Sequence, residues 1–349
     1  MSSRGGTVRA SIVVVAHNST GDLAACLDAL VTTIGADDEI IVVDNASTDR
    51  SREIASDRGC RVFRSERNIG FGAACNLGAR EAKGRFLVFV NPDAFVQAGW
   101  LDPLLRPIAD APGLSTARIT LADAPDTIDT AGNVVHVSGI TTCRGHGRPI
   151  AYYGRDDRVL AVSGACFAID RISFEALGGF DEGYFMYLED TDLSLRAALR
   201  GLPIHYVAGS NVRHRHTPSF GPGKIFWLER NRLRMALKLW STSTLVALLA
   251  HFAIVELLTW CYAATKGFEG LGAKARAYGW LIRHASNISR ERRATQATRR
   301  VDDRDLLARA AWRLDLTELV TDSRARALAS ALSRPVFALG QAWLKLILR

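Results

Sequence analysis

Three short apolar runs in the first ninety residues each stop at a polar turn, and this repetition limits the fold more than any other feature of the sequence. The runs are Ala10–Ala16, Glu39–Val43 and Phe86–Val90. Continuous apolar runs are typical of strands that are buried on both faces of a sheet. Because helical segments separate the runs, the pattern predicts an α/β fold with a doubly wound, mostly parallel sheet.

The third run ends at Asn91-Pro92-Asp93, because Pro92 cannot continue a sheet ladder. Ligands of open α/β sheets bind at the carboxyl ends of the strands, where Asp93 would be placed to hold a metal ion or a phosphate. Asn91 and Asp93 would also suit a simple Asx-type turn beside the proline. The second run ends at Asp44, and we expect Asp44 and Asp93 to lie side by side at the ligand-binding edge.

The remaining elements follow from capping, turn and periodicity signals. Gly70 to Cys75 resembles a dinucleotide fingerprint, but it lacks the last glycine or alanine and does not follow the first strand, which disfavours a Rossmann dehydrogenase. We predict a helix over residues 22–31, a second helix that Ser47 or Thr48 caps and that ends near Arg58, and a third helix that ends at Ala82. Further strands are predicted at residues 61–63, 159–168 and 203–207.

Three acids, Glu189, Asp190 and Asp192, open a predicted helix. Acids in a first turn complement the helix dipole, which is a sufficient structural reason for them. Asp192 stands four residues before Arg196, a spacing that suits an ion pair on one helix face. Asp190 has no such partner in the sequence, and we expect it to stay ionised, as a base for a hydroxyl nucleophile must.

Two histidines, His214 and His216, follow the last predicted strand of this region among arginines. They would serve equally as surface residues or as metal ligands, since neutral imidazole suits Mn²⁺ alongside carboxylates.

The six cysteines lie far apart without a C-x-x-C pair, so we expect reduced intracellular thiols. The first ten residues hold no apolar segment, and we expect no secretory signal.

The basic charge is concentrated after residue 212. Residues 213–349 contain 24 Lys and Arg against 10 Asp and Glu, whereas residues 1–212 contain 20 against 26. The basic residues alternate with apolar ones, which favours an anionic membrane surface as a partner over nucleic acid. We expect a catalytic domain over residues 1–240 and a helical, membrane-associating region over residues 241–349.

Within that region, Leu245–Ala264 is long enough to span a bilayer, but His251 and Glu256 near its middle make a span costly. An interfacial helix, a helix buried in the protein and a true span all remain open. Arg283–Arg304 is basic and polar and predicts a linker or solvated segment. Leu306–Val320 and Arg324–Arg349 have the spacing of amphipathic helices, which would lie on an anionic leaflet, cap the catalytic domain or form a dimer interface.

Taken in order on these elements, the motifs resemble those of family-2 inverting glycosyltransferases with the GT-A fold. The resemblance covers about residues 9–240 and is strongest to bacterial rhamnosyltransferase-like members. It rests on the VVAHNS opening, the DNASTD strand end, the NIGFGAACNLG segment, NPDA, the GGFDEGYFMYLEDTDLSLR block and the RNRLRMALK segment at Arg230 to Lys238. The usual metal motif is Asp-x-Asp; here Asn91 replaces the first acid, so the site loses a charge and His214 gains importance.

This resemblance implies a role for each matching residue. Asp44 would bind the nucleobase, and Asn68 and Asn76 would lie along the nucleotide-sugar. Asp93, with Asn91 beside it and His214 completing the site, would hold Mn²⁺ or Mg²⁺ on the diphosphate, and Asp190 would be the catalytic base.

The implied activity is transfer of a sugar, with rhamnose from dTDP-rhamnose as the best candidate, to a lipid-linked or saccharide acceptor in bacterial surface-glycan synthesis. The enzyme would work at the cytoplasmic face of the membrane and could form a homo-oligomer. Another donor (galactofuranose, glucose or N-acetylglucosamine) and a catalytically silent nucleotide-sugar-binding membrane scaffold remain as alternatives.

Overall fold

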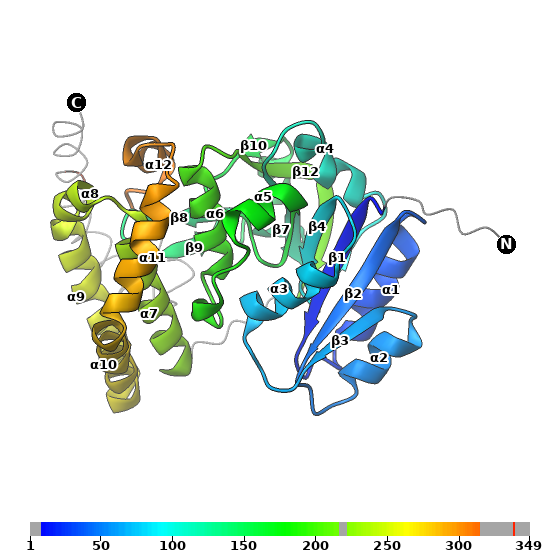
Figure 1. The fold of residues 1–349 in the computed structure, drawn as a ribbon, viewed down its shortest axis with the longest axis horizontal. Helices are drawn as coiled ribbons and strands as arrows, with labels where there is room; N and C mark the ends of the chain where they lie inside the picture. Colours follow the sequence, from blue (N-terminus) through cyan, green and yellow to red (C-terminus); the bar gives the residue numbers. More distant parts are fainter. Residues whose placement is uncertain (1–7, 216–221, 315–337, 339–349) are drawn as a thin grey trace. The chain divides into compact units, whose positions relative to one another are not determined.

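The computed structural model describes residues 8–215 and 222–314, together with residue 338 (Figure 1). The chain packs into two compact units. The first comprises residues 1–133, 143–197 and 202–217, and the second comprises residues 134–142, 198–201 and 218–349. The division at residue 240 remains a prediction about domains; in the structure, helix α7 (Pro222–Leu239) belongs to the second unit.

A ten-stranded sheet forms the centre of the first unit (Figure 1). Its order is β10-β12-β6-β11-β4-β1-β2-β3, with β5 beside β12 and β7 beside β6, while β8 and β9 form a separate pair. The strands are β1 (Ala10–Ala16), β2 (Asp38–Asn45), β3 (Arg61–Ser65), β4 (Phe86–Val90), β5 (Ala94–Val96), β6 (Leu114–Leu121), β7 (Ala124–Thr130), β8 (Asn133–Val135), β9 (Thr141–Cys143), β10 (Asp157–Arg158), β11 (Cys166–Asp170) and β12 (Ile204–His214).

The predicted α/β class is confirmed, but the sheet is mixed. Strands β4, β1, β2 and β3 run parallel, as the alternation of strands and helices requires. Strand β11 runs the other way, because it pairs antiparallel with both β4 and β6, whereas β6 and β12 pair parallel and have the direction of β4. The prediction of a mostly parallel sheet therefore holds for β3, β2, β1, β4, β6 and β12, but the antiparallel strands β5, β7, β10 and β11 make the sheet mixed.

Both faces of the parallel strands are covered by helices of the first unit. Successive residues of β1 point to opposite faces, so Ile12 and Val14 pack in the core cluster with α1 and α4, whereas Val13 faces α3. A Cβ atom on Gly78 would lie 2.5 Å from Cγ1 of Val13, so α3 packs closely on this face. The helices are α1 (Leu23–Thr33), α2 (Ser51–Asp57), α3 (Phe71–Glu81), α4 (Leu101–Ala109), α5 (Arg171–Leu177) and α6 (Glu189–Leu199), with short 3₁₀ turns at Ile150–Tyr153 and Glu182–Tyr184.

Two element predictions in this unit are wrong. Val159–Ala168 is not a strand, because strand β11 starts only at Cys166 and the preceding backbone groups bind loops and side chains such as the hydroxyl of Ser194. Neither Ser47 nor Thr48 caps α2, which begins at Ser51 without a side-chain cap. The Ser47 N–H is instead bound by the Asp44 carboxylate at 2.9 Å.

The second unit is helical. It contains α7, α8 (Thr242–Ala247), α9 (Leu249–Thr265), α10 (Gly267–Arg283), α11 (Ala285–Ala297) and α12 (Asp303–Arg309). Of the two alternatives predicted for Arg283–Arg304, the linker is wrong because most of the segment is α11, whereas the solvated segment is confirmed because Ile288 is the one buried residue of that helix. The apolar run Leu245–Ala264 is divided between α8 and α9 at Leu248. Within the part of the chain that the structure describes, no helix combines the length and the apolar character needed to cross a membrane.

A buried ion-pair network explains the acid in the middle of α9. Glu256 lies 2.5 Å from the guanidinium of Arg232 and 3.1 Å from Nζ of Lys274, and Glu229 pairs with the same two cations at 2.8 and 2.5 Å. Two acids and two bases thus neutralise one another inside the protein. Amphipathic helices were also predicted at Leu306–Val320 and Arg324–Arg349. The structure describes the first of these only to residue 314, which includes the end of α12, and the second only at residue 338; the rest lies outside the described residues.

Candidate active site

Strand β4 ends where Asn91-Pro92-Asp93 turns the chain into β5. The Asn91 carbonyl accepts a hydrogen bond from the Ala94 N–H at 3.1 Å, so the turn is closed by the backbone and not by the Asn91 side chain. Asp93 is partly exposed, with 35% of its side-chain surface accessible, but its Oδ1 atom is buried. The turn therefore directs one carboxylate oxygen of Asp93 to the interior of the site and leaves part of the side chain accessible to solvent.

His214 reaches the same point from the last residue of β12. Strand β12 pairs antiparallel with β5, which sets His214 opposite Ala94 and brings its Nε2 atom to 3.3 Å from Oδ1 of Asp93. Its Nδ1 atom lies 2.7 Å from Oδ2 of Asp129 in β7. Burial opposes a charge on His214, yet its hydrogen bond to Asp129 and the charges of Asp93 and Asp129 outweigh burial and raise its pKa to about 9.

The donor set formed by Asp93 and His214 fits a divalent ion that also binds a substrate diphosphate. Among the described residues, no cluster of three or more His, Cys, Asp or Glu side chains is arranged to hold a metal ion. Mg²⁺ is usually bound through one or two protein carboxylates together with substrate phosphates and water, so a small protein contribution is expected. The buried Oδ1 of Asp93 has a histidine nitrogen near it and receives no hydrogen bond from the described residues.

Asp190 is held at the start of α6 by neutral donors. Its Oδ2 accepts hydrogen bonds from the Gly164 N–H at 2.8 Å and from the Asn133 amide at 3.3 Å, and its Oδ1 accepts one from the Thr191 N–H at 2.6 Å. Burial raises the pKa of Asp190 in spite of these donors. The raised pKa makes Asp190 a stronger base than an exposed aspartate, and its ionisation remains a prediction.

Two consecutive residues connect Asp190 to the Asn91-Pro92-Asp93 turn. The Gly164 N–H binds the Asp190 carboxylate, and the carbonyl of Ala165 accepts the Asn91 N–H at 3.0 Å. A Cβ on Gly164 would lie 3.3 Å from Oδ2 of Asp190, so a larger residue would crowd the acid. The carboxylate of α6 and the turn after β4 are thus anchored to one short backbone segment.

The two acids beside Asp190 are in different environments. Burial, and then the charge of Asp190, raise the pKa of Glu189 to about 8, and its buried Oε2 accepts no hydrogen bond from the described residues. Asp192 is paired, with Oδ2 2.7 Å from Nε of Arg196 and Oδ1 2.9 Å from the Tyr184 hydroxyl. The predicted ion pair between Asp192 and Arg196 is confirmed.

The segment that leads into these acids is strained. Phe185, Tyr187 and Leu188 have φ angles of 65°, 67° and 66°, which L-residues rarely adopt. The Phe185 carbonyl accepts the Phe71 N–H at 2.7 Å, which ties the segment to the start of α3. Such strain occurs where the surroundings fix the chain, often at functional sites.

Asp44 is the second-to-last residue of β2, but it does not lie beside Asp93. Strand β1 lies between β2 and β4, so the predicted adjacency is wrong and the two strand ends are about 10 Å apart at the usual strand spacing. The Asp44 Oδ2 atom is buried, 3.4 Å from Nε of Arg64, and accepts no hydrogen bond from the described residues.

The amides of Asn68 and Asn76 are engaged by the protein. Asn68 Oδ1 accepts the Gly70 N–H at 2.9 Å and the Asn45 amide at 3.0 Å, which closes the loop before α3. Asn76 donates to the Phe180 carbonyl and accepts the Phe180 N–H, both at 2.9 Å. Their location along the nucleotide-sugar remains a prediction, and in the structure both side chains shape loops.

The sequence analysis did not identify Asp129, His146 or Asn133 as residues of the site. Asp129 is 1% exposed in a strand segment whose neighbours are also buried, and a buried acid without a sequence-near cation needs a partner from elsewhere in the chain. This need for a distant partner was the one signal that pointed to Asp129. The partners themselves come from strands and loops distant in sequence, so no spacing rule could have named them.

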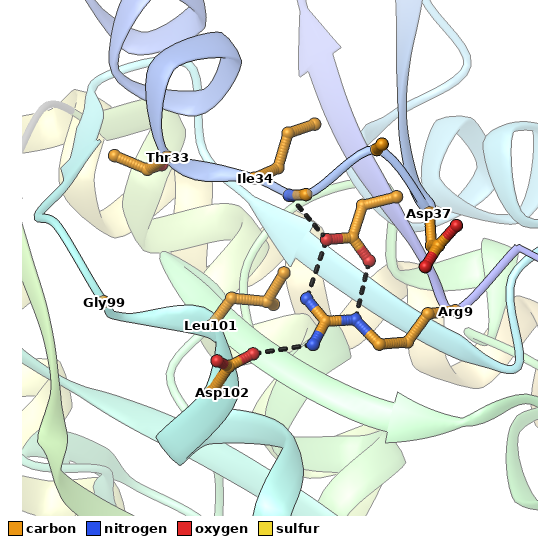
Figure 2. Close-up of a pocket in the computed structure, with 10 residues that line it drawn as sticks. Arg9, Thr33, Ile34, Asp37, Gly99, Leu101 and Asp102 are labelled. Carbon is orange, nitrogen blue, oxygen red and sulfur yellow. Dashed lines mark hydrogen bonds and ion pairs between the residues drawn. The ribbon is translucent and has the colours of Figure 1, made fainter.

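A pocket of about 400 Å³ lies at the opposite end of the strands (Figure 2). Arg9, just before β1, pairs there with Asp38 at 2.7 Å and with Asp102 at 2.6 Å. In Figure 2, dashed lines join the Arg9 guanidinium to Asp102 and to a second carboxylate without a label, which is that of Asp38. Because these charges satisfy one another at the amino ends of the strands, the pocket is a structural junction.

Comparison with known proteins connects this geometry to a family. Residues 11–177 match the model of glycosyl transferase family 2. The chain is 26% identical over 239 residues to N-acetylglucosaminyl-diphospho-decaprenol L-rhamnosyltransferase of Mycobacterium tuberculosis, which covers 60% of this chain and 77% of that protein. It is 28% identical over 227 residues to rhamnosyltransferase WbbL of Escherichia coli, covering 58% and 82%.

Solved glycosyltransferase structures share the fold. A GalNAc-T7 structure with UDP, GalNAc and Mn²⁺ matches with a TM-score of 0.58 at 20% identity, over 72% of this chain and 52% of that one. S. aureus TarS 1–349 in complex with UDP-GlcNAc matches with a TM-score of 0.55 at 16% identity, over 83% and 88%.

Other relatives are much longer than the matched region. The chain spans 25% of the uncharacterized protein y4gI of Sinorhizobium fredii and 18% of the O-antigen biosynthesis protein RfbC of Myxococcus xanthus. The match to the family model, the two rhamnosyltransferase relatives and the shared GT-A fold agree with one another. The chain is therefore similar to family-2 glycosyltransferases, and the family's model matches its residues 11–177.

Proposed function

We propose that this chain is a metal-dependent inverting glycosyltransferase that moves rhamnose from dTDP-rhamnose to a hydroxyl of a lipid-linked or surface-glycan acceptor. The observation that carries the proposal is the connection of Asp190 and the Asn91-Pro92-Asp93 turn through Gly164 and Ala165. A base and a diphosphate-binding turn on one rigid segment are what a single displacement needs. The names of the two rhamnosyltransferase relatives support the choice of sugar.

Asp190 acts on the acceptor. The acceptor hydroxyl attacks the anomeric carbon, its proton passes to the Asp190 carboxylate, and the bond between the sugar and the nucleoside diphosphate breaks. Because the raised pKa makes Asp190 a better proton acceptor than an exposed aspartate, such assistance contributes about 10²–10⁴-fold to the rate. The configuration at the anomeric carbon inverts because there is one displacement.

Asp93 and His214, with Asn91 beside them, bind a Mn²⁺ or Mg²⁺ ion that neutralises the diphosphate leaving group when bound. Asp44 binds the nucleobase through its buried Oδ2, which accepts no hydrogen bond from the described residues. The spacing of about 10 Å between the ends of β2 and β4 suits a nucleotide whose base and diphosphate are held by different strands. Asn68 and Asn76 support the donor indirectly through the loops that they close.

A donor screen tests the choice of sugar. Thermal unfolding of the full chain with Mn²⁺ is measured with dTDP-rhamnose, UDP-galactofuranose, UDP-glucose and UDP-N-acetylglucosamine. Because a ligand that binds only the folded state raises the Tm, dTDP-rhamnose should give the largest shift, and only with Mn²⁺ present. A larger shift with a UDP-sugar would move the proposal to that donor.

We propose further that the helical unit binds an anionic membrane at its cytoplasmic face, where a lipid-linked acceptor would be presented. Leu249 and Leu257 on α9 and Phe268 on α10 are 62%, 64% and 94% exposed, so apolar side chains and a basic composition occur together in this unit. In vesicle flotation, Leu257→Glu should weaken binding to anionic vesicles. Ile172→Glu, at an exposed apolar site on α5, is the control and should not. Equal binding by both variants would contradict the proposal.

A further inference from the structure

Asp129 occupies an irregular position in the sheet. Strand β7 pairs with β6, where Thr130 lies opposite Ile119 and Ile128 lies opposite Thr120, so two consecutive residues of β6 face three residues of β7. Asp129 is the extra residue, which makes this a β-bulge. Bulges redirect a side chain out of the regular alternation and often occur beside active sites.

The redirected carboxylate lies between two histidines. Its Oδ2 atom is 2.7 Å from Nδ1 of His214, and its Oδ1 atom is 3.2 Å from Nδ1 of His146, which is also 3.1 Å from the Asp129 carbonyl. The Asp129 side chain is only 2% exposed, whereas that of His146 is 29% exposed. A buried carboxylate is costly unless it is hydrogen-bonded, and the hydrogen bond to His214 offsets this cost.

His214 is thereby held at one nitrogen and presented at the other. Its Nδ1 is bound to Asp129, and its Nε2 points to Oδ1 of Asp93 at 3.3 Å. Histidines that ligate metals usually bind a carboxylate or carbonyl through the second nitrogen, which fixes the orientation of the ring. The order Asp129, His214, Asp93 has this arrangement.

We propose that Asp129 is a positioning residue of the metal site: it binds Nδ1 of His214 and so directs Nε2 at the divalent ion that Asp93 shares. This inference rests on the metal-binding part of the proposed function. Asp129 does not touch the ion or the substrate, and it acts through His214 alone.

The test measures Mn²⁺ binding without donor or acceptor. Free Mn²⁺ is followed by electron paramagnetic resonance in titrations of the full chain. Asp129→Asn keeps the size of the side chain and removes its charge, and it should weaken Mn²⁺ binding about 10–100-fold. Asp126→Asn, on the same strand at an exposed position, makes the same charge change and should leave the affinity unaltered.

A second comparison separates positioning from a general loss of structure. In a His214→Gln background, Asp129→Asn should cause no further loss of Mn²⁺ affinity, because the residue through which it acts is gone. Should Asp129→Asn fail to fold, Asp129→Glu, which keeps the buried charge but displaces the carboxylate, takes its place in both titrations.

The outcomes are distinguishable. Wild-type protein that binds Mn²⁺ neither alone nor in the presence of dTDP would refute the metal site of the proposed function and this inference with it. Wild-type binding together with equal binding by the Asp129 variant would overturn the positioning role alone. An equal loss in the wild-type and His214→Gln backgrounds would also overturn it, since Asp129 would then act by another route.

Discussion

Acidic side chains are buried in both compact units, but they are stabilised in different ways. In the helical unit, Glu229 and Glu256 are neutralised by Arg232 and Lys274. At the carboxyl edge of the sheet, Asp190 is held by neutral N–H donors and an amide. Burial therefore raises the pKa of Asp190, whereas the cations lower the pKa of Glu229 in spite of its burial.

This difference separates structural charges from chemically useful ones. A carboxylate paired with two cations is a weak base and holds helices together. A carboxylate held by dipoles keeps its basicity and can accept a proton. In the same unit, the buried Oδ2 of Asp44 and Oε2 of Glu189 receive no hydrogen bond from the described residues. Full charge pairing thus marks the scaffold, and incomplete pairing marks the site.

The largest expected effect is on turnover at the sheet edge. Asp190→Asn should lower kcat by about 10²–10⁴-fold, because the acceptor proton loses its base. Donor binding should persist, since the proposed role of Asp190 concerns the acceptor. The Tm should not fall, because the substitution removes a buried acid. Turnover by a radiolabelled transfer assay and binding by thermal shift measure the two. Substantial residual turnover would assign the base to Glu189 or Asp192.

In the helical unit, we expect the next largest effect, a loss of folding stability when the ion-pair network is broken. Lys274→Met leaves two buried acids with one cation, and breaking a buried ion pair costs about 3–5 kcal/mol. Arg276→Met removes one positive charge at an exposed position of the same helix and should change stability by less than about 0.5 kcal/mol. Denaturant unfolding followed by circular dichroism compares the two, and equal stability of both variants would mean that the network contributes little.

The smallest effect is a pH dependence at Glu189. Its pKa is raised to about 8 in the folded chain from an ordinary value of 4.5, so the unfolded chain releases this proton first and wild-type stability declines between pH 4.5 and pH 8. Glu189→Gln removes this cost, and should be more stable than wild type by on the order of 2–4 kcal/mol at pH 8.

Near pH 4 the difference between Glu189→Gln and wild type should vanish, because both states of the wild-type chain are then protonated at this group. The exposed Glu66→Gln is the matched control and should show no such pH dependence. A constant difference between the Glu189 variant and wild type across this range would show that Glu189 is ionised in the folded protein.

Local signals in the sequence were sufficient for the elements that carry the site. The apolar run at Phe86–Val90 matches strand β4 without change, and the acids at 189–192 open α6 as predicted. The ion pair of Asp192 with Arg196 was readable as well, because a spacing of four residues on a helix is a local property. These features depend on neighbours in the chain, which the sequence displays.

The membrane question shows where a local pattern fails. A central acid made Leu245–Ala264 a poor span, but the sequence did not reveal that Arg232 and Lys274 would neutralise Glu256. Those cations lie on α7 and α10, and pairing them with the acid depends on how three helices pack.

The sequence by itself determined the α/β class, the turn that presents Asp93 and the helix start that presents Asp190, because strand, turn and capping preferences act over a few residues. Only the tertiary structure decided that β1 separates Asp44 from Asp93, that β11 reverses direction, and that Asp129 meets His214. Strand order and the contacts of a bulged residue arise from pairings between distant segments. Their energies depend on the whole packed sheet, so no window of sequence contains them.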